Sequence, residues 1–190
     1  MKRNKRGMIF IAVGVTLLLV ASGLYVKNIY EDKKAGEYAS GLLNQLVAQE
    51  KRQIINKNEN LPIIEIDGDA FIGKIVIDKL GTTLPVFDEW SYERLKKAPC
   101  RYSGSIATDN LIIAAHNYKS HFGDLKTLEK DDEIIFVDAN GKKYKYAVKE
   151  ITFLDGTAVT DMQSGKWDFT LFTCTKSGKQ RVTVRCDKIS

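Results

Sequence analysis

Twenty consecutive residues near the N-terminus, Gly7 to Val26, carry no charge. At about 1.5 Å per residue, a helix of this length spans the hydrocarbon core of a bilayer, which is about 30 Å thick. The stretch therefore predicts one transmembrane helix at 7–26. The rest of the chain must then form its domain on one side of the membrane.

The charges around this segment predict its orientation. Residues 1–6 contain four basic residues and no acidic one, whereas acidic residues follow soon after Lys27. We therefore expect a cytoplasmic basic tail at 1–6, a single-pass anchor in the cell membrane and an extracellular remainder. A cleaved signal peptide is the alternative, because small residues lie at 20–23, but the apolar stretch exceeds the roughly 7 to 15 residues of such a peptide.

The net charge mostly reflects this tail. The chain has 29 basic and 24 acidic residues; four of the basic ones lie in the tail, which leaves 25 against 24 outside it. An external part that is nearly neutral offers no cationic face, so we expect no nucleic-acid partner.

A helical stalk and linker are expected at 27–60. The segment from Tyr30 to about Asn56 is rich in helix formers, with leucine and valine at helical spacing. Such a stalk could pack on the following domain or simply hold it away from the membrane. The asparagine-rich run at 56–60 and Pro62 indicate a linker before a domain at 61–190.

That domain is predicted to be mainly β, with short helices. Brief connections separate its apolar segments, and Asn140 followed by Gly141 predicts a hairpin. This spacing is typical of a closed barrel or a sandwich. The β-type segments lie at 71–77, 83–87, 111–115, 133–137, 143–151, 167–175 and 180–186.

The last two segments predict a hairpin that brings a thiol beside a guanidinium. If residues 177–178 form a two-residue turn, Cys174 pairs with Arg181, and the two Cβ atoms lie roughly 5 Å apart. Arg185 would instead pair with Thr170, about 13 Å along the strand. A nucleophile beside an oxyanion binder indicates acyl transfer. The alternative is an ordinary surface arginine beside a buried cysteine.

Three cysteines are an odd number for an extracytoplasmic domain. Cys174 and Cys186 should lie on opposite faces and about 16 Å apart, outside disulfide range. We expect Cys174 to be a free thiol and Cys186 a small buried hydrophobe. Cys100 is either another structural thiol or a residue at the border of the site.

A reactive thiol usually needs a histidine partner. His116 follows an apolar run that starts at Leu111, and the end of a strand can present a side chain to a cleft. A core histidine with a satisfied hydrogen bond is the alternative. His121 lies in a polar segment and is expected to be a solvated loop residue.

These residues resemble the motifs of the sortases. Three separated motifs occur in the family's order, behind an N-terminal anchor: the run from Leu111 to Asn117 with Phe122 and Leu125 downstream, the run from Thr170 to Cys174, and Arg181 before a Val-Thr-Val run. The resemblance covers roughly residues 70–188. It implies a closed eight-stranded β-barrel and a membrane-anchored cysteine transpeptidase of a Gram-positive bacterium.

By this resemblance, the expected substrates are LPxTG-like sorting signals of secreted surface proteins. The family cuts Leu-Pro-x-Thr-Gly between Thr and Gly and joins the threonine carbonyl to an amine of the peptidoglycan precursor or of a pilin. The resemblance maps the catalytic residues to Cys174, His116 and Arg181. Candidate substrate-binding residues in the same motifs are Ala114, Thr170, Phe172 and Thr173.

The class within the family stays open. The histidine segment resembles class B, while the lack of a long helical insertion before the cysteine strand gives an A- or D-like layout. Some class A enzymes bind calcium, but residues 101–108 contain no acidic cluster, and the spacing of the cysteines does not fit zinc. We therefore predict no required metal and no cofactor.

Two other functions are alternatives. One is a cell-wall cysteine hydrolase or peptidase that passes the acyl group to water. The other is a non-enzymatic, membrane-tethered β-barrel binding module in which Cys174 is structural.

Overall fold

The computed structural model describes residues 5–49, 55–58, 61–165 and 167–189, so residues 1–4 of the predicted tail, 50–54 of the stalk and 59–60 of the linker lie outside it. The chain divides into two compact units, residues 1–34 and 35–190. Its elements in chain order are α1 (Lys5–Gln49), β1 (Ile55–Asn58), β2 (Leu61–Ile66), β3 (Asp69–Ile77), η1 (Asp78–Leu80), β4 (Thr82–Phe87), α2 (Tyr92–Leu95), β5 (Cys100–Ser103), β6 (Leu111–Ala114), η2 (Leu125–Thr127), β7 (Glu133–Asp138), β8 (Lys143–Asp155), α3 (Val159–Gln163), β9 (Phe169–Cys174) and β10 (Gln180–Lys188).

Helix α1 contains the predicted membrane segment. Among the residues that the structure describes, it is the one helix long and apolar enough to cross a membrane. Its most apolar 18-residue window has a mean hydropathy of 2.4 and is not buried. The helix does not stop where the apolar segment stops at Val26 but continues to Gln49, because good helix formers follow.

The C-terminal part of α1 packs on the domain. Ala35, Ala39, Leu42 and Leu46 recur every three or four residues and are all buried. The last three belong to the same hydrophobic cluster as the barrel core. Of the two possibilities for the stalk, packing is therefore the correct one for this part, and the alanines let the helix backbone come close.

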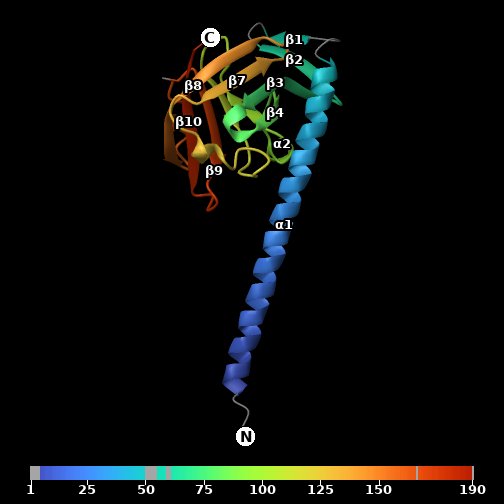
Figure 1. Cartoon of the computed structure of the whole chain (residues 1–190), viewed down its shortest axis with the longest axis vertical. Helices are drawn as coiled ribbons and strands as arrows, with labels where there is room; N and C mark the ends of the chain where they lie inside the picture. The colour runs from blue at the N-terminus through green and yellow to red at the C-terminus, as the bar shows by residue number, and fades with distance from the viewer. Residues whose placement is uncertain (1–4, 50–54, 59–60, 166, 190) are drawn as a thin grey trace. The chain divides into compact units, whose positions relative to one another are not determined.

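Eight strands close into the predicted barrel. Their order is β3-β4-β5-β6-β9-β10-β8-β7, and β3 pairs with β7 to complete the ring. β10 lies between β8 and β9 (Figure 1). β2 pairs with the first residues of β3, and β1 adds to β2 outside the ring.

The barrel closes at Gly73. The register of β3 against β4 shifts between Phe71 and Gly73, and φ of Gly73 is +143°. A Cβ atom at this position would lie 2.0 Å from the carbonyl oxygen of Val137 on β7. Only glycine combines this backbone conformation with so close a neighbour. The absence of a side chain at residue 73 therefore lets β7 pair closely with β3.

The hairpin predicted at Asn140–Gly141 is present. β7 and β8 pair from Val137 and Lys143 onward, and φ of Gly141 is +79°. The Asp138 carboxylate accepts hydrogen bonds from two backbone amides of the turn.

Other predicted boundaries are wrong. Strand β1 occupies residues 55–58, where a linker was predicted, and Pro62 lies inside β2. Strand β5 was not predicted, because Cys100–Ser103 is short and mixed in polarity. Strand β8 extends beyond residue 151 to Asp155.

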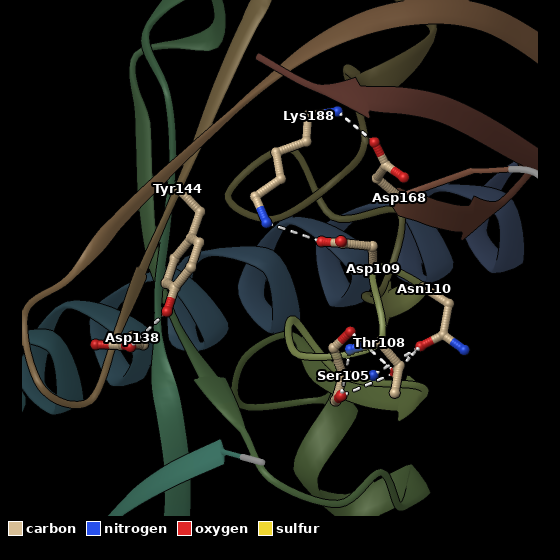
Figure 2. A network of polar contacts seen from close by, with 8 residues as sticks. All are labelled: Ser105, Thr108, Asp109, Asn110, Asp138, Tyr144, Asp168 and Lys188. Carbon is tan, nitrogen blue, oxygen red and sulfur yellow. Dashed lines mark hydrogen bonds and ion pairs between the residues drawn. The ribbon is translucent and has the colours of Figure 1, made fainter. Parts of the chain in front are cut away.

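One lysine connects the end of β10 to the residues that precede β6 and β9 (Figure 2). The Lys188 backbone amide donates to Asp168 Oδ2 at 2.8 Å, and its Nζ lies 2.9 Å from Asp109 Oδ1. Asp168 immediately precedes β9, and Asp109 lies just before β6. The end of β10 is thus tied to the start of its neighbour β9 and to the start of β6, the next strand beyond β9.

We expect Leu46→Ala to lower the free energy of unfolding of the domain by about 2–5 kcal/mol, because it leaves a cavity where α1 meets the core. Val47 is 49% exposed, so Val47→Ala, the matched control, should change it by less than about 0.5 kcal/mol. Urea denaturation of both variants measures the difference. Equal effects would mean that α1 does not pack as described.

Candidate active site

Three neighbouring strands bring the predicted catalytic residues level with one another. Cys174 on β9 lies opposite Arg181 on β10, as predicted. In the parallel β6–β9 pair, Ala114 is level with Phe172. His116 lies two residues beyond the end of β6, and Cys174 lies two residues beyond Phe172 on β9, so continuing this register brings the two level. Residues two apart in an extended segment share a face. The three side chains therefore belong to one row across the outer face of the barrel.

The turn of this hairpin differs from the predicted one. The amide of Gly178 donates to the Thr175 carbonyl at 2.9 Å, so Lys176 and Ser177 are the central residues of the turn rather than Ser177 and Gly178. Gly178 follows them at φ +73°. The predicted strand pairing is unchanged by this shift of the turn, because the Thr175 amide still donates to the Gln180 carbonyl.

A cavity of about 240 Å³ lies over the row of three residues. His116, Cys174 and Arg181 all line it, together with Ala114 and Phe172 from the same face of β6 and β9. Most of its other lining residues come from the β4–β5 connection, from Tyr102 on β5, from Asp155 at the end of β8 and from the β8–β9 connection.

An aromatic group from the β4–β5 connection and from β5 lines one part of the cavity. Trp90 lies 5.6 Å from Tyr92 and 6.0 Å from Tyr102, and Tyr102 meets Phe172 edge-on at 5.2 Å (ring centroids). Trp90 and Tyr92 are exposed. These residues were not predicted from the sequence, although two aromatic side chains in a polar segment are a signal of a binding surface.

The β8–β9 connection contributes Ala158, Val159 and Met162. Buried Arg185 holds it in place: its guanidinium donates to the carbonyl oxygens of Asp161 at 2.6 Å and Met162 at 2.9 Å. Hydrogen bonds from a charged donor to carbonyl oxygens are stronger than those from a neutral one. Arg185 does not line the cavity itself but holds the connection that lines it.

Cys174 differs from the other two cysteines. All three are free thiols, but Cys100 and Cys186 are buried and only Cys174 is half-buried. Burial raises the pKa of Cys100 to about 12 and raises the pKa of Cys186 as well. The expectations of a free Cys174 and a buried Cys186 are confirmed, and Cys100 is a structural thiol.

Arg181 lies at the border of the cavity. Its Nη1 donates to the carbonyl oxygens of Gly178 at 2.9 Å and Gln180 at 3.3 Å. Gly156 packs against it, since a Cβ there would lie 3.3 Å from Nη1. Hydrogen bonds from Thr157 and, to a smaller extent, the charge of Arg181 lower the pKa of Asp155.

The two histidines have opposite environments. His116 is half-buried and lines the cavity, and its ring lies 4.8 Å from that of Tyr118. His121 is only 1% exposed, so the prediction of a solvated loop residue is wrong. Its segment folds back under Tyr118, whose carbonyl accepts a hydrogen bond from the His121 amide.

The four candidate substrate-binding residues separate into two pairs. Ala114 and Phe172 line the cavity. Thr170 and Thr173 are buried and do not line it: the Thr173 hydroxyl donates to the Ala115 carbonyl at 2.8 Å, and that of Thr170 accepts from Arg185 at 3.0 Å. The two threonines hold strands and loops together.

No group of three or more histidine, cysteine, aspartate or glutamate side chains that could hold a metal occurs in the described part of the chain.

Comparison with known proteins identifies the family. A model described as the sortase domain matches residues 75–189, which is more than half of the chain and includes His116, Cys174 and Arg181. The chain belongs to the sortase family, whose members are cysteine transpeptidases. No curated protein matches it.

Solved sortases share the fold. Sortase C1 from Streptococcus suis is 24% identical, with a TM-score of 0.55 over 63% of this chain and 73% of that one. Sortase C from Clostridium perfringens SM101 is 20% identical (TM-score 0.55, 89% of this chain and 97% of that one). A Clostridium perfringens sortase D5 transpeptidase is 22% identical (TM-score 0.58, 85% and 99%).

A small alkylating reagent should label Cys174 at least about a hundredfold faster than Cys100 or Cys186, because the buried thiols react only when the domain opens. At pH 8 their raised pKa values also keep them protonated. Peptide mass spectrometry after timed labelling measures the three rates. Similar rates would contradict the exposure described here.

The two arginines of β10 should behave differently on substitution. Arg181→Ala should lower kcat by about 10²- to 10³-fold, as loss of an oxyanion donor does, with little change in the unfolding midpoint. Arg185→Ala should instead lower the free energy of unfolding by about 1–3 kcal/mol and raise KM, because it releases the connection that contains α3. Equal kcat losses would argue against distinct roles.

Proposed function

We propose that this protein is a membrane-anchored sortase that cleaves an LPxTG-like sorting signal between Thr and Gly. Cys174 forms a thioacyl intermediate, and the acyl group passes to an amine of the peptidoglycan precursor or of a pilin. The observation that supports this most is the row across β6, β9 and β10, in which His116, Cys174 and Arg181 share one cavity.

In the first half-reaction, the Cys174 thiolate attacks the threonine carbonyl carbon. The carbonyl oxygen takes the negative charge beside Arg181, and collapse of this intermediate breaks the C–N bond while His116 protonates the leaving amine. In the second half-reaction, the acceptor amine attacks the thioester, His116 takes its proton and Cys174 leaves as the thiolate. His116 gives one proton to the leaving amine and takes one from the acceptor amine, so the enzyme returns to its starting protonation state.

Arginine suits the oxyanion role because it stays charged and has five N–H donors. Both hydrogen bonds of Arg181 within the described residues use Nη1. Its Nη2 and Nε have no hydrogen-bond partner among the described residues, so they are available to a developing oxyanion.

The cavity walls support a signal with apolar residues. Trp90, Tyr102, Phe172 and Met162 offer aromatic and thioether surfaces that favour leucine and proline side chains. These residues, with Ala114, are the substrate-binding residues that we propose; Thr170 and Thr173 act through the strands instead.

Anchoring by α1 would hold the domain at the outer surface of the cell membrane, with residues 1–6 in the cytoplasm. There it would meet sorting signals of secreted surface proteins as well as the amine acceptor.

To test this function, the protein is mixed with LPxTG-pattern peptides and triglycine, and the products are analysed by mass spectrometry. We expect a product in which triglycine is joined to the threonine carbonyl. Cys174→Ala and His116→Ala should each lower its formation about a thousandfold or more, while Ser177→Ala, in the exposed turn, should not.

Two outcomes would replace the proposal. Only water-cleaved peptide in the presence of triglycine would indicate the cysteine hydrolase. Unchanged activity of Cys174→Ala would indicate a binding module with a structural cysteine.

A further inference from the structure

The segment that follows β6 connects His116 to the buried core. The Phe122 amide donates to the His116 carbonyl at 3.2 Å, and the Gly123 amide donates to the Tyr118 carbonyl at 2.8 Å. Phe122 is fully buried. Because these bonds close the segment into a compact loop, a displacement of its middle is transmitted to the backbone of His116.

Helix α1 contacts the middle of this loop at Gly36. A Cβ atom on Gly36 would lie 3.0 Å from Ser120 Cβ and 3.5 Å from its Oγ. Carbon atoms in contact normally stay about 3.5–4.0 Å apart, so the helix comes this close only because residue 36 has no side chain. The neighbouring Ala35 and Ala39 are buried and hold this stretch of helix against the domain.

A second glycine shows that the contact is specific to one position. Gly41 is exposed, and a Cβ there would have no neighbour within 4 Å. Glycine inside a helix costs about 1 kcal/mol relative to alanine. At Gly36 the approach to Ser120 accounts for that cost; at Gly41 nothing in the structure does.

We propose that α1 positions the catalytic histidine through this contact, with Gly36 and Ser120 as positioning residues for acyl transfer. The inference rests on the proposed role of His116. A side chain at residue 36 pushes Ser120 away from the helix. Since Phe122 is held in the core, the movement is taken up between Ser120 and His116, and the imidazole shifts relative to Cys174.

The test compares Gly36→Leu with Gly41→Leu in the full-length chain in detergent micelles. Both variants replace a helical glycine with the same good helix former, so they differ in the contact alone. Gly36→Leu should lower kcat between about tenfold and a hundredfold, the range expected for a misplaced catalytic group. The KM of the sorting peptide should change less than about twofold, because Trp90 and Phe172 remain in place. Gly41→Leu should retain wild-type values.

Two further measurements separate positioning from a general loss of structure. The limb of the pH profile of kcat/KM that depends on His116 should shift in Gly36→Leu, whereas partial unfolding would only scale the profile. Adding Ser120→Gly makes room for the new side chain and should recover most of the lost kcat. If Gly36→Leu fails to fold, Gly36→Ala gives a smaller change in the same direction.

Wild-type kcat and an unshifted pH profile in Gly36→Leu would overturn the inference, and so would an equal loss in Gly41→Leu or no recovery by Ser120→Gly. His116→Ala keeps the two proposals apart. If His116→Ala is inactive while Gly36→Leu has normal activity, only the positioning role fails. If His116→Ala is active, the proposed function of His116 fails.

Discussion

The whole site depends on the pairing of β9 with its two neighbours. β9 runs parallel to β6 and antiparallel to β10, so the ends of two strands and the start of a third meet in one row. A slip by one residue in either pair would turn a catalytic side chain to the other face of the sheet. Lys188 opposes such a slip at the C-terminal end of β10, where it bonds to the residues that precede β6 and β9.

The three catalytic candidates become a site only because other residues enclose them. The Arg185 guanidinium donates hydrogen bonds to two carbonyl oxygens of the β8–β9 connection and thereby holds Met162 in the cavity lining. Trp90 and Tyr102 provide the opposite part of the lining. A partly enclosed, largely apolar cavity strengthens the interaction between an oxyanion and a guanidinium, because little water competes for either. The substrate itself would complete this enclosure.

Local patterns in the sequence predicted the β9–β10 hairpin well. Its strands are adjacent in the chain, so a short turn and alternating side chains determine the partners of Cys174 and Arg181 even though the turn lies one residue earlier than expected. The parallel pairing of β6 with β9 could not be predicted from local sequence patterns, because more than fifty residues separate the two strands. The burial of His121 was missed for the same reason: a polar segment of sequence folds beneath Tyr118 through tertiary contacts. Strand β5 and the aromatic lining likewise depend on partners distant in sequence.

The proposed function requires Cys174, in register with His116 and Arg181, to be the acyl carrier. Its most direct test is to incubate the protein with a sorting peptide without an acceptor amine, quench in acid and locate the adduct by peptide mass spectrometry. We expect the peptide, cut after threonine, to be bound to Cys174, and we expect this adduct to form much more slowly in Arg181→Ala. Turnover without an adduct on Cys174, or an adduct on another residue, would contradict it.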